Sequence, residues 1–220
     1  MYRFEVEMKT LSVFNQKGGV GKTTATVNIG AAFALMLSSE AAPDQEPGRV
    51  LIVDLDQQIH ASALLSGCFF GYHETSPGAY DDNPPSLGHL ACNSLIAASH
   101  VLVPIQLAAP ALFSLSETIR TIQSIQKKHN RELQLVGILA TMCDFRYQEH
   151  KEFYSALSQQ YGDLLLPPIT RLAEVEYASS EGLDIFSFKP GRHAEVLASS
   201  SRATQEYAQV AEIVRQRMDR

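Results

Sequence analysis

The sequence predicts a doubly wound α/β domain built on a mostly parallel sheet. Short apolar runs alternate with longer stretches of helical periodicity, as in parallel sheets that carry helices on both faces. A glycine-rich loop, NQKGGVGKTT at residues 15–24, also stands between a predicted strand and a predicted helix. The chain has 220 residues, 45% of them hydrophobic, which suits one domain spanning residues 1–220.

The predicted elements follow the apolar pattern along the chain. Buried strands are expected at residues 10–15, 49–54, 100–104, 133–141 and 164–167. Helices are expected at residues 22–39, 87–98, 111–129, 148–161 and 202–218. In the last helix one face carries only apolar or aromatic side chains, which predicts core packing for Tyr207, Val210, Ala211 and Val214.

Composition excludes several classes of protein. With a net charge of −6, the chain can contact nucleic acid only through a local basic patch. No run reaches the roughly 18 apolar residues of a membrane helix, and no signal-peptide stretch is present, so we expect a cytoplasmic protein without a membrane partner. The three cysteines, Cys68, Cys92 and Cys143, form no CxxC pair and are expected to be reduced and mostly buried.

The glycine-rich loop predicts a phosphate-binding site for ATP and Mg²⁺. Its glycines let backbone N–H groups turn toward a phosphate, and the following helix adds the positive end of its dipole. Lys22 can reach the β- and γ-phosphates, Thr23 can offer its hydroxyl to Mg²⁺ and Thr24 can bond the α-phosphate. The nucleotide-binding residues expected in and beside this loop are Lys17, Gly18, Gly19, Val20, Gly21, Lys22, Thr23 and Thr24.

Lys17 is not needed for this cradle, and with it the loop resembles a known motif. The stretch is similar to the deviant Walker A motif, KGGVGKT followed by Ser or Thr, of the ParA/MinD family of P-loop ATPases. The resemblance covers nearly the whole chain and is closest to the ParA (Soj) partition ATPases. It implies that Lys17 reaches across a dimer interface to the partner's nucleotide and acts there as an arginine finger does in other enzymes.

Two aspartates follow the second predicted strand. Asp54 and Asp56, in VDLDQQ, are similar to the family's VDLDPQ. Carboxylates at the end of a strand beside a phosphate loop can hold Mg²⁺ or orient water. The resemblance implies that Asp54 lies near the metal and that Asp56 positions the hydrolytic water. The next residues depart from the family, because Gln57, Ile59 and His60 replace its proline, glycine and asparagine.

A third aspartate, Asp82, stands in DNPPSLG, which resembles the family's D-x-PPSLG and implies the Walker B aspartate that holds Mg²⁺ through water. The region around residues 67–82 is shortened: SPGAYD replaces an apolar strand, and the spacing from Asp56 is less than half that of the family. Three explanations stay open. Residues of the polypeptide are missing from this sequence, which we favour, or the gene carries an internal deletion, or residues 68–73 (CFFGYH) replace the strand.

Two further segments resemble parts of the family, a strand that ends near the nucleotide and a strand with the switch-like loop that follows it. Residues 135–146 (LVGILATMCDFR) are similar to a family strand that ends near the adenine. This makes Asp144 a candidate nucleotide-binding residue, with a surface turn as the alternative. Residues 100–115 are similar to a strand and a switch-like loop, which is expected to be shaped by Pro104, Gln106 and Pro110.

The end of the chain resembles segments whose basic residues bind duplex DNA without sequence preference in ATP-bound dimers. ITRLAEVEYASSEG and SRATQEY carry the resemblance. Glu174, which replaces a family arginine, and the acidic balance of the chain predict weak, salt-sensitive binding. The implied DNA-binding residues, for which solvated surface charge is the alternative, are Arg171, Lys189, Arg192 and Arg202.

The resemblance implies an ATP-dependent homodimer that drives plasmid or chromosome segregation. Lys17, Lys22 and Asp56 are its implied catalytic residues, and a centromere-binding, ParB-like protein stimulates its slow ATP hydrolysis on nucleoid DNA. One alternative is a MinD-like positioning ATPase, although the last helix lacks the bulky apolar residues and lysines of a membrane-targeting helix. Another is a non-hydrolysing nucleotide-binding module. The cysteine pattern does not fit an iron–sulfur reductase.

Overall fold

The computed structural model describes residues 8–55, 89–108, 111–189 and 201–220 of the chain. Within these residues three parallel strands form a sheet in the order β1-β2-β3. The strands are β1 (Leu11–Val13), β2 (His100–Gln106) and β3 (Gln134–Thr141). Parallel neighbours need a long crossover connection, and α4 (Ala111–Lys128) supplies it between β2 and β3.

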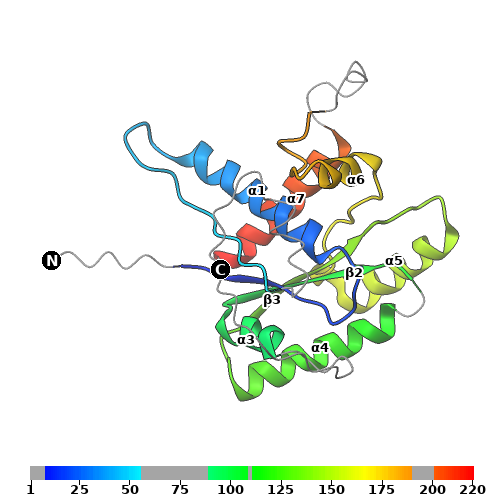
Figure 1. Cartoon of the computed structure of the whole chain (residues 1–220). Helices are drawn as coiled ribbons and strands as arrows, with labels where there is room; N and C mark the ends of the chain where they lie inside the picture. The colour runs from blue at the N-terminus through cyan, green and yellow to red at the C-terminus, as the bar shows by residue number, and fades with distance from the viewer. Residues whose placement is uncertain (1–7, 56–88, 109–110, 190–200) are drawn as a thin grey trace, which may run out of the picture.

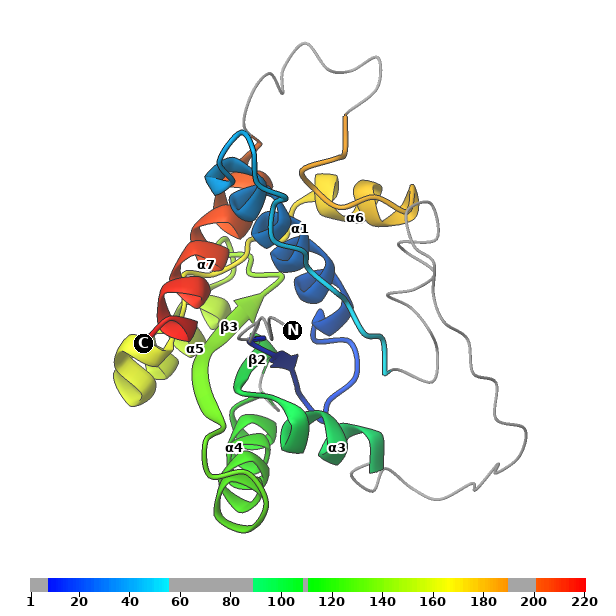
Figure 2. The ribbon, with the colours of Figure 1, turned by 90° about the vertical axis from the view of Figure 1, so that its left-hand side faces the viewer.

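Helices cover both faces of the sheet (Figure 1). On one face α1 (Lys22–Glu40) packs beside α7 (Arg202–Met218), with the shorter α6 (Ala173–Ser180) nearby. On the other face lie α3 (His89–Ala97), α4 and α5 (Gln148–Tyr161). Figure 2 shows α1, α6 and α7 on one side of the strands and α3 and α4 on the other. This layered arrangement confirms the predicted α/β class.

β2 lies at the centre of the described sheet and is buried on both faces. Val103 and Ile105 pack with α3, α4 and α5, while Leu102 packs with α1 and α7. Successive side chains of a strand point to opposite faces, which explains the continuous apolar run of this strand. The strand ends two residues beyond the prediction, so Pro104 and Gln106 belong to it and not to the loop expected there.

The helix predictions agree closely with the structure. α5 and α7 have the predicted bounds, and α1 and α4 each differ by one residue at the C-terminus. The Ser201 hydroxyl caps α7 by accepting the N–H of Thr204, and the predicted apolar face of α7 is buried as expected. The sequence did not predict α6 or the short 3-10 helix η1 (Gly162–Leu164).

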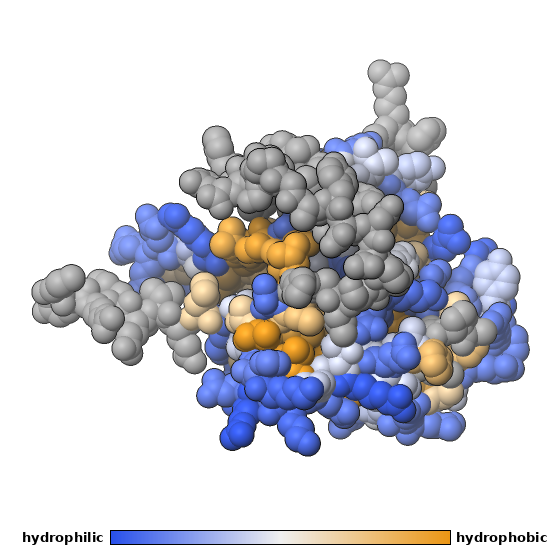
Figure 3. Space-filling model, turned by 60° about the horizontal axis from the view of Figure 1, so that its bottom comes forward, coloured by the Kyte–Doolittle hydropathy of each residue, from blue (hydrophilic) through white to orange (hydrophobic). Residues whose placement is uncertain are grey.

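The predicted strand at residues 49–54 is wrong: these residues form no strand. Ile52 rests on α1, because a Cβ built on Gly30 would lie 2.9 Å from Ile52 Cδ1. On the other side Leu51 and Val53 are 77% and 64% exposed. A strand needs a paired neighbour, and within the described residues β1 pairs only with β2. Figure 3 shows one face of the molecule, and on that face a group of hydrophobic residues is exposed at the surface.

The predicted strand at residues 164–167 is also wrong in form. Leu164 ends η1, and only an isolated bridge joins Leu165 to Ile138 of β3. Pro167 and Pro168 follow, and because proline has no N–H group, neither can extend a ladder. The segment nevertheless runs close beside β3 and parallel to it, since a Cβ on Gly137 would lie 2.7 Å from Leu166 Cγ.

Candidate functional site

The glycine-rich loop connects β1 to α1, as predicted. Gly19 and Gly21 adopt positive φ angles of 74° and 78°. Residues with a side chain rarely adopt this left-handed conformation, so the loop needs glycine at both positions. Gly21 is the N-cap of α1, and Lys22 begins the helix. The two glycines therefore turn the chain sharply from the sheet into the helix.

The N-terminus of α1 is suited to an anion. The helix has no acidic residue in its first turn and no side-chain cap. The first N–H groups of a helix have no partner within it, and they carry the positive end of the dipole. Thr23 and Thr24 lie in this first turn. The arrangement fits a phosphate group, as the sequence predicted.

The two lysines of the loop are brought together. Lys22 Nζ donates a hydrogen bond of 3.0 Å to the main-chain carbonyl oxygen of Lys17. Within the described part of the chain, no hydrogen bond or ion pair is assigned to the side chain of Lys17. Lys17 thus places a cation at the entrance of the loop while its backbone contacts the second lysine.

Thr141, at the end of β3, anchors the loop and was missed by the sequence analysis. Its hydroxyl lies 2.8 Å from the carbonyl oxygen of Val20 and 3.2 Å from that of Ile105. Val20 itself is buried at 1% exposure. The sequence signal that could have identified Thr141 is a polar residue at the end of a predicted buried strand. Only the tertiary structure shows that β3 ends beside the loop.

Of the three aspartates predicted for the site, one lies within the described residues and two lie outside them. Asp54 is half-buried in the segment that runs along α1, and Asp56 and Asp82 lie outside the described residues. Within the described ranges no group of three or more histidines, cysteines, aspartates or glutamates could hold a metal. Two of the residues predicted to hold Mg²⁺ lie in the described ranges, Thr23 in the first turn of α1 and Asp54 in the segment beside that helix, and both offer the oxygen ligands that Mg²⁺ prefers.

Asp144 lies just beyond β3 and holds Arg146. Arg146 Nε is 2.9 Å from Asp144 Oδ1, and the guanidinium approaches Oδ2 at 2.6 Å. The side-chain hydrogen bonds of Arg146 lower the pKa of the Asp144 carboxyl to about 2. The turn also contains Met142, whose φ of 50° is the one positive value at a non-glycine residue in the described chain. Strained backbone of this kind often accompanies functional sites.

Two of the four predicted DNA-binding residues, Arg171 and Arg202, lie close together. Arg202 Nε donates to Glu206 Oε1 at 2.7 Å, and its guanidinium also reaches the Thr170 hydroxyl at 2.9 Å. Arg171 is exposed and pairs with Glu176 at 3.3 Å. Arg171 and Arg202 thus flank Thr170, each beside a carboxylate. Lys189 is exposed, and Arg192 lies outside the described residues.

The thiols follow the prediction where they are described. Cys143 is buried and Cys92 is partly buried, and both are free; Cys68 lies outside the described residues. Burial raises the pKa of the Cys143 thiol to about 12, with a smaller contribution from Glu206. A thiol with so high a pKa is a poor nucleophile at neutral pH.

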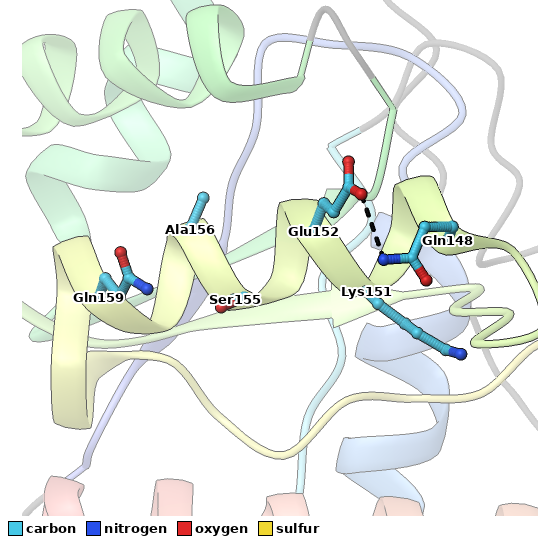
Figure 4. A pocket seen from close by; sticks show the side chains of 6 residues that line it. All are labelled: Gln148, Lys151, Glu152, Ser155, Ala156 and Gln159. Carbon is cyan, nitrogen blue, oxygen red and sulfur yellow. Dashed lines mark hydrogen bonds between the residues drawn. The ribbon is translucent and has the colours of Figure 1, made fainter.

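Two hollows at the described surface lie away from the predicted site residues. Both are shallow and lie on α5, and Figure 4 shows the first, in which Gln148 donates to Glu152 at 3.2 Å. Lys151, Ser155 and Gln159 line both hollows, and none of the predicted site residues lines either. No helix in the described ranges combines the length and the apolar character needed to cross a membrane.

Comparison with known proteins agrees with this geometry. Chromosome-partitioning ATPase Soj of Treponema pallidum is 31% identical, over 82% of this chain and 90% of the relative. Soj of Thermus thermophilus is 29% identical, over 86% of this chain and 92% of the relative. Sporulation initiation inhibitor protein Soj of Bacillus subtilis is 28% identical over 252 residues, a match longer than this 220-residue chain. That match therefore includes positions at which this chain has no residue.

Solved structures show the same fold. McdA of Cyanothece in its apo form has a TM-score of 0.59 at 17% identity, covering 94% of this chain and 99% of McdA. The septum site-determining protein MinD of Pyrococcus horikoshii, solved with Mg-ADP, has a TM-score of 0.56 at 17% identity, covering 94% and 95%. The family described as the CobQ/CobB/MinD/ParA nucleotide binding domain matches residues 11–185. The chain belongs to this family of nucleotide-binding domains.

Proposed function

We propose that this protein is a Mg²⁺-dependent ATPase of the ParA type, which forms a homodimer with ATP and segregates a plasmid or chromosome. One observation carries the proposal. Lys17 lies at the entrance of the loop, and Lys22 Nζ donates a hydrogen bond of 3.0 Å to the Lys17 carbonyl oxygen. The similarity to the Soj ATPases supports the same reading. A second lysine at this place is suited to a nucleotide held by a partner subunit.

The proposed chemistry is in-line attack of water on the γ-phosphate. An oxygen–phosphorus bond forms to water, the bond to the β-γ bridging oxygen breaks, and ADP and phosphate leave. Asp56 orients the attacking water, while Lys22 and the partner subunit's Lys17 offset the charge that develops. Asp144, beside the end of β3, is the candidate for contact with the adenine.

Mg²⁺ neutralises phosphate charge when it is bound. The residues proposed to hold it are Thr23, Asp54 and Asp82. Thr23 lies in the first turn of α1, where its hydroxyl is next to the predicted phosphate site. The remaining loop residues bind through their backbone, because the N–H groups of Gly18, Gly19, Val20 and Gly21 line the turn into the helix.

The proposed partners are duplex DNA of any sequence and a centromere-binding, ParB-like protein, which places the dimer on the nucleoid in the cytoplasm. Arg171, Lys189, Arg192 and Arg202 are the proposed DNA contacts. Because Glu176 and Glu206 accompany two of these arginines, we expect weak binding that falls as salt is raised. Electrophoretic mobility shifts with the ATP-bound protein at about 50 and 200 mM salt check this. Binding that is unaffected by salt would exclude phosphate contact.

The first test is the molar mass in solution, measured by light scattering with Mg-ATP, with a slowly hydrolysed analogue and with ADP. A dimer is expected only with ATP or the analogue. Lys17→Ala should remain a monomer and lose turnover, yet still bind ATP. A Lys17→Ala protein that dimerises and hydrolyses ATP like the wild type would overturn the proposal.

A second candidate is a nucleotide-binding module that does not hydrolyse ATP. It is favoured by the edge of the described sheet, where β1 pairs only with β2 and residues 49–55 form no strand. In that case ATP binding should persist without turnover even when DNA and the partner protein are added. Measured release of phosphate under those conditions would exclude it.

A further inference from the structure

Asn15, the first residue of the loop and two residues before Lys17, is a buried amide that connects three parts of the molecule. It is only 4% exposed. Its Nδ2 donates to the carbonyl oxygen of Pro104 in β2 at 2.7 Å, and its Oδ1 accepts the main-chain N–H of Lys17 at 2.9 Å. The Thr118 hydroxyl of α4 lies 3.4 Å from the same Oδ1.

The amide replaces a rung of the sheet at the place where β1 ends. Phe14 N donates to Leu102 O at 2.9 Å, so the backbone of residue 14 is bonded toward β2. In a parallel ladder the next rung would run from the N–H of residue 16 to the carbonyl of Pro104. Asn15 Nδ2 occupies that carbonyl instead, and Pro104 has no N–H with which to hold β1. The chain is thereby released from the sheet into the loop.

α4 supports the same place from a second side. Gln16 Nε2 donates to the Thr121 hydroxyl at 2.9 Å. Thr118 and Thr121 are three residues apart and lie on the same side of α4. The Thr118 hydroxyl also lies 2.9 Å from the carbonyl oxygen of Ser114. Because this distance is shorter than that to Asn15 Oδ1, the hydroxyl donates mainly to the Ser114 carbonyl. The contact of Asn15 with α4 is therefore weaker than its bonds to Pro104 and Lys17.

The backbone of Lys17 is held at both ends. Its N–H is bonded to Asn15 Oδ1, and its carbonyl accepts Lys22 Nζ. Phosphate groups compete for the Lys22 ammonium, because a charge-assisted bond to phosphate is stronger than one to a neutral carbonyl. If the Lys22 side chain leaves the Lys17 carbonyl to bind a nucleotide, the hydrogen bond from the Lys17 N–H to Asn15 Oδ1 still fixes the Lys17 main chain.

We propose that Asn15 is the positioning residue for Lys17, aligning it from β2 and α4 for its action on the partner's nucleotide. This inference rests on the proposed function of Lys17 across the dimer interface. Asn15 touches neither nucleotide nor water in this account. It acts by keeping the Lys17 main chain in one orientation after Lys22 has moved to the phosphates.

The test compares Asn15→Ala with a matched variant, Asn28→Ala. Asn28 is buried to a similar degree, at 3% exposure, and its amide also bonds two main-chain groups, Thr24 O and Ile185 N. It does not contact Lys17. Asn15→Ala should bind ATP as a monomer within about twofold of the wild type, yet lose ATP-dependent dimerisation. Its turnover should fall by about ten- to a hundredfold, as expected when a reacting group is misplaced by around 1 Å.

Asn15→Asp supplies a second readout, which also serves if Asn15→Ala does not fold. An ionised carboxylate can accept the Lys17 N–H but cannot donate to Pro104 O, whereas the protonated acid can do both. At about pH 8 the turnover of Asn15→Asp should therefore fall as that of Asn15→Ala does, because the bond to Pro104 O is lost. Turnover of Asn15→Asp equal to that of the wild type contradicts the proposal.

The outcomes separate the two proposals. If wild type and Lys17→Ala behave alike, the proposed function fails, and the role of Asn15 fails with it. If they differ while Asn15→Ala matches the wild type or Asn28→Ala, only the role of Asn15 is overturned. An equal loss of monomer ATP affinity and turnover in Asn15→Ala also overturns it, because that result means that the amide merely keeps the loop folded.

Discussion

The ammonium nitrogen of Lys22 lies 3.0 Å from the main-chain carbonyl oxygen of Lys17, so the two lysines of the loop contact each other through opposite partial charges. This contact separates their roles. Lys22 Nζ is directed back across the loop to this carbonyl. In the proposed function Lys22 meets the phosphates of its own subunit, while Lys17 acts on the nucleotide of the partner. The two positions should therefore respond differently to substitution.

Lys22→Ala should weaken ATP binding by the monomer, and Lys17→Ala should not. Loss of a hydrogen bond from a charged group costs about 1.5–3 kcal/mol, which corresponds to roughly a ten- to hundredfold rise in Kd. Isothermal titration calorimetry with ATP measures both variants. The same loss of affinity in Lys17→Ala would show that both lysines bind the nucleotide within one subunit.

Replacement of Gly21 by alanine should destabilise the loop. Its φ of 78° costs a residue with a side chain about 1–2 kcal/mol, and the added Cβ would lie 3.5 Å from the Thr141 side chain. Gly18→Ala is the matched control, because its Cβ meets nothing within 4 Å and its φ is not positive. Urea unfolding should show lower stability for Gly21→Ala only; equal effects would contradict the strain argument.

Glu206→Gln should lower the free energy of unfolding by about 1–3 kcal/mol, the cost of weakening hydrogen bonds to a charged group. Glu206 accepts the main-chain N–H and the hydroxyl of Thr170 and pairs with Arg202, which joins α7 to the segment beyond β3. Glu212→Gln makes the same change of charge on an exposed side of the helix, where Gln216 is its partner.

The Glu212→Gln control should stay within about 0.5 kcal/mol of the wild type. Thermal unfolding of the two variants in one buffer makes the comparison. If both variants lose the same stability, the effect comes from net charge, and the bonds between Glu206 and Thr170 contribute nothing specific.

Stability should fall at mildly acidic pH because of His100. Burial lowers the pKa of this imidazole, and the charge of Lys9 lowers it further, against a smaller opposing contribution from Asp219. The unfolded chain, with a histidine pKa of about 6.5, therefore takes up a proton before the folded chain does. The contribution of His100 is complete above that pH and is lost as the pH falls toward the folded pKa.

His100→Gln, which cannot take up a proton in this range, provides the comparison for this prediction. Urea midpoints measured between about pH 8 and pH 5 should fall more steeply for the wild type than for the variant. Parallel curves for the two proteins would show that other groups cause the acid sensitivity.

Much of the fold could be predicted because local patterns report it. α5 and α7 have the predicted bounds, since the periodic apolar face of a helix is written in adjacent residues. The strand predicted at residues 49–54 failed because apolar character indicates burial but not pairing. α6 was missed because its eight residues carry a weak periodic signal between an extended segment and a run of turns.

The site shows the same division. The glycines with positive φ and the two lysines were predicted because the loop is continuous in sequence. Thr141 and Asn15 were not identified, although both were visible as polar residues at strand ends. Their partners lie far away in the chain, at Val20 and Pro104 respectively. A pattern of neighbouring residues cannot predict which strand ends lie side by side in the folded protein.

The sequence by itself determined the fold class, the loop and the residues that suit it to phosphate, because these depend on backbone conformation and side-chain chemistry within a few consecutive residues. Only the tertiary structure decided what holds the loop in place. The parallel sheet brings the ends of β1, β2 and β3 to one edge, and there Asn15 and Thr141 bond distant carbonyl groups. Buried polar groups must find partners, and folding alone selects which ones they meet.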